Sequence, residues 1–238
     1  MHKTLSQPMV LENYEALCRS AADCVLETVR QKPGSVICVA TGASPLGLYA
    51  ELAKHAAELA QAHILKLDEW GGLAMDDPAT CEVYIQREVL GPWGLPAESM
   101  TGFQSDAADR ETECARIRAA VERLGGIDVC ILGMGADGHI GLNYPAASLP
   151  AETHVTDAST LRHAMLDAAL RKPTHGFTLG MAEVLRSRTI VLVVNGAAKA
   201  HAVQRLMTGE ITTEFPASLL WLHDDVHLFA DHSAVPAL

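Results

Sequence analysis

A short apolar run at residues 127–132 passes directly into a glycine-rich segment at 133–145. A short run that is rich in branched side chains and is followed by glycines is typical of a strand buried in a parallel sheet. The glycines let the chain turn tightly and bring its backbone close to a ligand. Asp137 and His139 stand two residues apart in this segment, so the carboxylate can orient the imidazole and raise its basicity. The pattern predicts a strand followed by a loop that carries chemistry, although a structural turn with a surface histidine fits the Asp-Gly-His triplet alone equally well.

A second apolar run, at residues 36–40, ends in a loop of small residues before a helix that opens with Pro45. The loop consists of Thr41, Gly42, Ala43 and Ser44. At a helix N-terminus, such a loop offers backbone N–H groups and hydroxyls to an anion, usually a phosphate. It matches neither a Walker A loop nor a dinucleotide fingerprint, so a nucleotide is not favoured. The same residues also suit an ordinary strand-to-helix turn.

Two adjacent acids, Asp68 and Glu69, close a third apolar run at residues 64–67. At the carboxyl end of a strand they would face the crevice in which open α/β sheets bind ligands. Neighbouring strand residues point to opposite faces, so we expect at most one acid to enter the site while the other holds the loop. A solvated pair of acids is the alternative.

Strand-like and helix-like runs alternate along the 238 residues. Helices are expected near 10–31, 45–60, 78–90 and 109–124, and strands near 35–41, 62–68, 127–133, 189–195 and 226–230. The alternation predicts an α/β fold, a Rossmann-like, mainly parallel sheet with helices on both faces. No repeat or linker divides the chain, so we expect residues 1–238 to form a single domain.

Composition narrows the classes of partner. A net charge of −11 makes nucleic acid an unfavourable partner and leaves any anionic ligand to be captured by local groups. Six cysteines without a CxxC pair indicate reduced thiols and a cytoplasmic protein. No run approaches the ~18 apolar residues of a membrane span, and we expect neither a span nor a signal peptide. The eleven histidines form no tight ligand pattern, so no metal site is predicted.

In order, these segments resemble the glucosamine-6-phosphate deaminase and 6-phosphogluconolactonase superfamily, most closely its galactosamine-6-phosphate deaminase/isomerase branch. The likeness runs nearly end to end and rests on residues 40–46, 66–70, 80–82 with 90–95, 135–143 and 215–223. It implies the Rossmann-like fold, one sugar-phosphate isomerase/deaminase-like domain and no organic cofactor. The implied partner is a small sugar phosphate, and a monomer and a homo-oligomer both remain open.

The implied reaction converts a 2-amino-2-deoxy-hexose 6-phosphate, with galactosamine 6-phosphate favoured over its C4 epimer, to a ketose 6-phosphate and ammonia. By resemblance, Asp68 is the base that moves a proton between C2 and C1. His139 then assists ring opening, and Asp137 fixes its tautomer.

The resemblance also implies how the sugar phosphate is held. Residues 41–44 form the phosphate loop, and Lys199, which follows the strand expected at 189–195, is the phosphate lysine. Arg162 is the nearest candidate for a second basic ligand. Ser159 stands where the galactosamine branch tends to have an arginine.

Tyr144 departs from the deaminase pattern, which normally has a glutamate before Pro145. The lactonases have an aromatic residue there. A phenol with a pKa near ~10 can donate a hydrogen bond but cannot replace a carboxylate as a base. The alternatives are therefore a 6-phosphogluconolactonase-type hydrolase and a non-catalytic sugar-phosphate-binding relative. A sensor domain of a transcription regulator is disfavoured, because no basic helix-turn-helix precedes the first expected strand.

Overall fold

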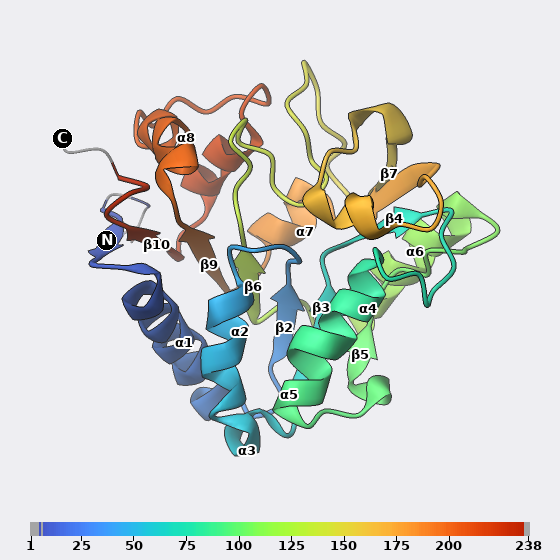
Figure 1. Ribbon diagram of the computed structural model, residues 1–238, viewed down its shortest axis with the longest axis horizontal. Coiled ribbons are helices and arrows are strands. Elements are labelled where there is room, and N and C mark those ends of the chain that lie inside the picture. Colours follow the sequence, from blue (N-terminus) through green and yellow to red (C-terminus); the bar gives the residue numbers. More distant parts are fainter. Residues whose placement is uncertain (1–4, 6, 236–238) are drawn as a thin grey trace.

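A seven-stranded sheet runs through the middle of the molecule, and each neighbouring pair of its strands is parallel (Figure 1). The computed structural model describes residue 5 and residues 7–235. In spatial order the strands are β1 (Met9–Leu11), β10 (Val226–Asp231), β9 (Thr189–Val194), β6 (Val129–Leu132), β2 (Val36–Val39), β3 (His63–Lys66) and β5 (Met100–Thr101). The chain leaves β2 towards β3 on one side, whereas β6 lies on the other. Open α/β sheets bind ligands at such a reversal, outside the carboxyl ends of the strands.

Helices lie along the whole chain between these strands. Up to β6 they are α1 (Tyr14–Gln31), α2 (Leu46–Ala53), α3 (Ala56–Leu59), α4 (Cys81–Ile85), the π-helical turn η1 (Gln86–Leu90), α5 (Gly91–Trp93), the 3₁₀ turn η2 (Ala97–Ser99) and α6 (Arg110–Arg123). After β6 they are α7 (Met181–Leu185), α8 (Ala200–Leu206) and the 3₁₀ helices η3 (Ala158–Thr160), η4 (Ala164–Ala168), η5 (Ala197–Lys199) and η6 (Pro216–Leu222). Within residues 7–235, even the 18-residue α1 lacks the apolar length that a membrane crossing requires.

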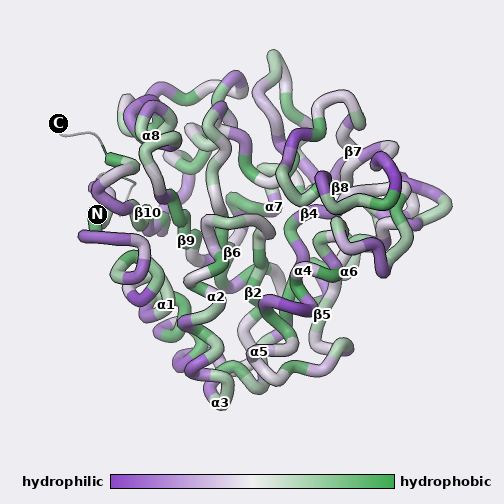
Figure 2. Tube along the Cα trace, in the orientation of Figure 1, coloured by the Kyte–Doolittle hydropathy of each residue, from purple (hydrophilic) through white to green (hydrophobic). Residues whose placement is uncertain are grey.

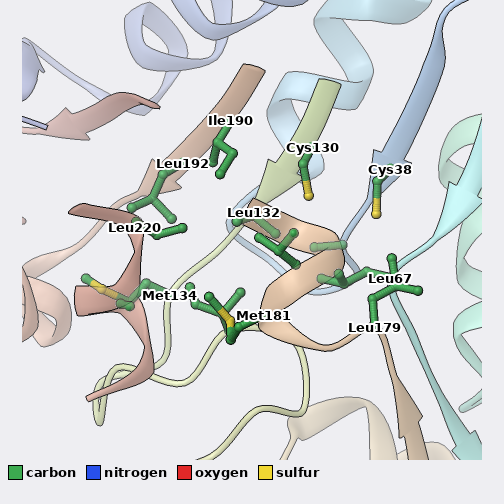
Figure 3. Packing of buried hydrophobic residues seen from close by; sticks show 14 of the residues in the cluster. Cys38, Leu67, Cys130, Leu132, Met134, Leu179, Met181, Ile190, Leu192 and Leu220 are labelled. Carbon is green, nitrogen blue, oxygen red and sulfur yellow. The ribbon is translucent and has the colours of Figure 1, made fainter. Parts of the chain in front are cut away.

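Both faces of the sheet are buried. Ile37 and Val39 of β2 pack into one apolar cluster with α1 and α2, whereas Val36 and Cys38 pack into another with α6, α7 and α8. Figure 3 shows the second cluster, where side chains of β2, β6 and β9 meet those of α7 and η6. Hydrophobic residues accordingly concentrate in the strands of the central sheet (Figure 2). The predicted parallel α/β fold, with helices on both faces, is confirmed.

A second, antiparallel sheet was not expected. It has the order β4 (Asp68–Gly71), β8 (His175–Thr178) and β7 (His154–Asp157). The strand predicted near 62–68 is confirmed as β3, but its end is corrected: β3 stops at Lys66, and Asp68 begins β4 of the second sheet. Leu67 joins the two sheets: its N–H donates to Val39 O (3.2 Å) and its carbonyl accepts from Leu179 N (2.9 Å).

Two helix predictions also need correction. The helix expected at 10–31 begins at Tyr14, because Met9–Leu11 pairs with β10 as β1 and the Asn13 side chain then caps the helix. The helix expected at 45–60 is interrupted after Ala53 and resumes as α3. At the start of α1, strand pairing and the Asn13 cap outweigh apolar periodicity.

Candidate active site

A cavity of about 410 Å³ opens at the carboxyl end of the parallel sheet. The loops that follow β2, β6 and β9 contribute to its wall, together with the first residues of β4 and residues 162–164. Nine of the ten predicted site residues line it: Thr41, Gly42, Ala43, Ser44, Asp68, His139, Tyr144, Arg162 and Lys199. The tenth, Asp137, is hydrogen-bonded to His139. The structure thus brings together residues that lie up to 158 positions apart in the chain (199 − 41).

The loop after β2 has its carbonyl groups held by tyrosine hydroxyls. Tyr84 donates to Gly42 O (2.6 Å), and Tyr14 lies within hydrogen-bonding distance of Ala43 O (3.0 Å) and Ser44 O (2.9 Å). The N–H groups of residues 42–44 donate to no other described residue. With its carbonyl oxygens engaged and its N–H groups available, the loop suits an anion.

Basic side chains add positive charge to the cavity wall. Lys199 and Arg162 line it, and neither forms an ion pair with another described residue. Burial lowers the pKa of Lys199 from its ordinary value, and the Asp137 carboxylate opposes that shift. A site with available lysine and arginine can capture a phosphate although the protein carries a net charge of −11.

Asp137 and His139 form a close pair. His139 Nδ1 lies 2.6 Å from Asp137 Oδ1, and the His139 backbone N–H donates to the same oxygen at 3.1 Å. Gly135 and Gly138 permit this turn: a Cβ at Gly135 would collide with the imidazole, and Gly138 has a φ of +85° and lies against Phe215. Burial lowers the pKa of His139 below its ordinary value, and the opposing effect of Asp137 does not cancel this shift. The pair leaves Nε2 of a largely neutral imidazole for proton transfer.

Tyr144 packs against this imidazole. The ring centroids of Tyr144 and His139 are 4.9 Å apart. Burial raises the pKa of Tyr144 to about 12, so the phenol stays protonated at neutral pH. It can therefore donate a hydrogen bond at this position but cannot act as a base.

Asp68 projects into the cavity from the first position of β4 and is only 7% exposed. Burial raises its pKa to about 7, and the neighbouring Glu69 carboxylate adds to the rise. The Cys81 thiol and Lys66 act in the opposite direction. A carboxyl group that titrates near neutral pH is suited to general base catalysis.

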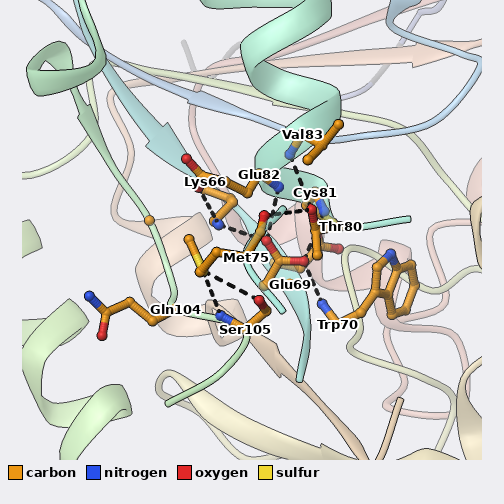
Figure 4. A network of polar contacts seen from close by, with 12 residues as sticks. Lys66, Glu69, Trp70, Met75, Thr80, Cys81, Glu82, Val83, Gln104 and Ser105 are labelled. Atoms are coloured by element: carbon orange, nitrogen blue, oxygen red, sulfur yellow. Dashed lines mark hydrogen bonds and ion pairs between the residues drawn. The ribbon is translucent and has the colours of Figure 1, made fainter. Parts of the chain in front are cut away.

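Glu69 does not line the cavity. Its side chain holds the start of α4 through the contacts drawn in Figure 4. Its carboxylate accepts from the backbone N–H groups of Trp70 (2.8 Å), Cys81 (2.8 Å) and Glu82 (2.9 Å). Lys66 Nζ lies 2.7 Å from Glu69 and 2.8 Å from Glu82. The expectation that one acid enters the site while its neighbour holds the loop is confirmed.

Two ring-bearing cavity residues, Trp70 and His163, were not among the predicted site residues. His163 was counted only among the scattered histidines, and Trp70 only as part of a motif. The His163 and Trp70 rings lie 5.8 Å apart, and a Cβ at Gly42 would lie 3.2 Å from His163 Nε2. Each directly follows a residue that the sequence analysis did single out: Trp70 follows Glu69, and His163 follows Arg162. Within residue 5 and residues 7–235, no three His, Cys, Asp or Glu side chains are placed to hold a metal ion.

The sequence model of the family described as "Glucosamine-6-phosphate isomerases/6-phosphogluconolactonase" matches residues 11–229. The chain belongs to this family. A protein of Escherichia coli (strain K12), named "Putative deaminase AgaI", is 41% identical over 229 residues, which cover 94% of this chain and 90% of that protein. The glucosamine-6-phosphate deaminase of Oceanobacillus iheyensis is 33% identical over 232 residues, which cover 94% of this chain and 93% of the relative.

Solved structures of the family agree with this placement. A monomeric glucosamine-6-phosphate deaminase superimposes with a TM-score of 0.87 at 33% identity, covering 96% of this chain and 98% of the other. The 6-phosphogluconolactonase of Trypanosoma cruzi has a TM-score of 0.78 at 15% identity, covering 98% and 97%, and shares the fold. The predicted membership in the glucosamine-6-phosphate deaminase and 6-phosphogluconolactonase superfamily is confirmed.

Proposed function

We propose that this protein isomerises and deaminates a 2-amino-2-deoxy-hexose 6-phosphate, preferably galactosamine 6-phosphate, to a ketose 6-phosphate and ammonia. The buried Asp68 carboxylate carries the proposal, because it lines one cavity with both an N–H-rich loop and the His139–Asp137 pair. We favour the galacto epimer because residues 80–82 and 90–95 resemble that branch. We assign the reaction to the cytoplasm, where six cysteines without a CxxC pair would remain reduced.

The phosphate is bound first in this scheme. The backbone N–H groups of residues 42–44 and the ammonium group of Lys199 receive the phosphate, and Arg162 is the second basic ligand. Because the phosphate lies at C6, fixing it directs the C1–C2 end of the sugar towards the other cavity residues. The proximity so gained replaces a bimolecular encounter with a positioned one.

Ring opening uses His139. Its Nε2 takes the proton of the anomeric hydroxyl and returns it to the ring oxygen, while Asp137 holds Nδ1–H and steadies the tautomer. The Tyr144 phenol can donate to an oxygen beside the imidazole. Position 144 supplies no carboxylate beside the Asp137–His139 pair, and we expect ring opening to be slower than with the glutamate that is usual there in the deaminases.

Asp68 then acts on the open-chain amino aldehyde. Its carboxylate removes the C2 proton while the C2 ammonium group passes a proton to the carbonyl oxygen at C1, which gives an enolamine. Asp68 then returns its proton to C1. The resulting imine at C2 adds water, and the carbinolamine expels ammonia. One water molecule is consumed, and the products are the ketose 6-phosphate and ammonia.

The test assays galactosamine 6-phosphate, glucosamine 6-phosphate and 6-phosphogluconolactone with the wild type, Asp68→Asn, His139→Ala and one control variant. The wild type should release ammonia from galactosamine 6-phosphate faster than from glucosamine 6-phosphate. Asp68→Asn should lose ~10²–10⁴-fold in kcat with little change in substrate binding. Asp106→Asn, at an exposed acid outside this cavity, is the matched control. Wild-type ammonia release by Asp68→Asn would refute the role of Asp68.

The aromatic residue at 144 keeps lactone hydrolysis as the second candidate. A lactonase needs a histidine to activate water and has no use for an enolising base. His139→Ala should abolish either activity, whereas Asp68→Asn should largely spare a lactonase. Rapid hydrolysis of 6-phosphogluconolactone by the wild type, without ammonia release from either amino sugar, would replace the deaminase proposal.

A further inference from the structure

Cys81 links the phosphate loop to the proposed base. It is the first residue of α4 and is fully buried. Its thiol donates to Asp68 Oδ1 at 3.8 Å, and the same sulfur lies 3.5 Å from Thr41 Oγ1. A thiol has one hydrogen, so when it points to Asp68 the Thr41 hydroxyl must donate to the sulfur. The three groups then form a chain of donors that ends at the carboxylate.

The thiol is the only hydrogen-bond donor to the Asp68 carboxylate among the described residues. Thiols are weak donors compared with N–H and O–H groups. A weak donor restricts the direction of the carboxylate while stabilising its negative charge only slightly. This suits a base, because strong hydrogen bonds to the charged form would reduce its basicity.

The surroundings fix the thiol in place. Glu69 accepts the Cys81 backbone N–H at 2.8 Å, and the Thr80 hydroxyl caps α4 by accepting from Val83 N at 3.2 Å. Burial raises the pKa of Cys81 well above its ordinary value, so the sulfur keeps its proton. Cys81 therefore remains a donor over the whole neutral range.

We propose that Cys81 is a positioning residue, which aims the Asp68 carboxylate into the cavity through a weak S–H hydrogen bond, and that Thr41 sets the direction of this thiol. The inference rests on the proposed function in taking Asp68 as the base. It also changes the role expected for Thr41, because a hydroxyl that donates to Cys81 is not donating to a phosphate. The loop then binds phosphate through residues 42–44.

The experiment follows the protonation of Asp68 and turnover separately. In the wild type, Cys81→Ala, Cys81→Ser and Thr41→Val, the carboxyl carbon of Asp68 is titrated by ¹³C NMR without substrate and assigned with Asp68→Asn. The groups that interact electrostatically with Asp68 stay constant in this comparison: Cys38, Tyr49, Lys66, Glu69 and Tyr144. Cys114→Ala, at a buried cysteine of α6 outside the cavity, is the matched control.

Removing the donor should raise the titration midpoint of Asp68 in Cys81→Ala by about half a pH unit to one unit. We also expect kcat to fall by about 3- to 10-fold with KM within about twofold. Cys81→Ser should recover part of both changes, and Thr41→Val should shift them in the same direction by less.

A Cys81→Ala midpoint and kcat equal to those of Cys114→Ala would overturn the inference, as would a change in KM alone. If Cys81→Ala does not fold, Cys81→Ser and Thr41→Val decide by the same two readouts. The NMR titration needs no turnover. Absence of ammonia release in the wild type would therefore count against the proposed function, whereas an unmoved midpoint would count against Cys81.

Discussion

Replacing Lys66 by methionine tests whether the buried polar network around α4 stabilises the fold. Lys66 is fully buried, and its ammonium group contacts Glu69 at 2.7 Å and Glu82 at 2.8 Å. Burial disfavours its charged form, but the two carboxylates outweigh this and raise its pKa. Methionine fills a similar volume without the charge, so the variant removes the ion pairs with little change in packing.

The expected loss of unfolding free energy depends on the burial of the ion pair and not on the distance between its charged atoms. Lys54 and Glu51 also lie 2.7 Å apart, but their side chains are 64% and 21% exposed. Both side chains of the Lys66–Glu69 pair are 0% exposed. Loss of one partner of a buried pair costs about 3–5 kcal/mol, because the remaining charge stays desolvated. An exposed pair contributes about 0–1 kcal/mol.

The assay is urea unfolding of Lys66→Met, Lys54→Met and the wild type, followed by circular dichroism at neutral pH. Lys66→Met should lose about 3–5 kcal/mol of unfolding free energy, and its Tm should fall by roughly 6–20 °C. Lys54→Met should stay within about 1 kcal/mol of the wild type. Equal losses in the two variants would refute the argument that burial decides the contribution.

Three further predictions concern Asp68 and Tyr144. Because the Asp68 pKa is raised to about 7 and the base must be deprotonated, kcat/KM should rise with pH through about 7, and a profile flat from about pH 5 to about 9 would contradict this. The same shift from 3.8 to about 7 means that the folded state binds the proton more tightly, so the stability contributed by Asp68 is complete below pH 3.8 and is lost by about pH 7. Asp68→Asn should therefore gain up to about 4 kcal/mol relative to the wild type as pH rises through this window, and urea unfolding at its two ends should not give equal differences. Tyr144→Glu places a carboxylate beside His139 and should raise kcat on galactosamine 6-phosphate if ring opening limits the rate; a folded variant with unchanged kcat would remove that explanation.

The parts of the site that sequence could predict depend on local signals. Glycines after an apolar run indicate a turn, and the Asp137–His139 spacing of two residues brings the carboxylate to the imidazole within that turn. The loop at residues 41–44 is recognisable for the same reason. Parallel topology then brings the loops together, because parallel strands end at one edge of the sheet.

The missed features depend on contacts between distant segments. The antiparallel sheet pairs Asp68–Gly71 with His175–Thr178, more than a hundred residues later, and no turn signal connects them. Cys81 meets Asp68 across 13 residues and Thr41 across 40. No local sequence feature of a cysteine at the start of a helix indicates that its thiol contacts a carboxylate on a distant strand.

The two adjacent acids show how the fold assigns different tasks to identical functional groups. Glu69 receives three backbone N–H groups and the Lys66 ammonium group, whereas Asp68 receives one thiol. Strong donors stabilise a carboxylate as an anion and make it a structural anchor, while a desolvated carboxylate with a weak donor retains its affinity for protons. Because Asp68 and Glu69 are neighbouring residues of β4, the pleat of the strand turns their side chains to opposite sides. Asp68 therefore keeps its basicity because the backbone N–H groups at the start of α4 donate to Glu69 and not to Asp68.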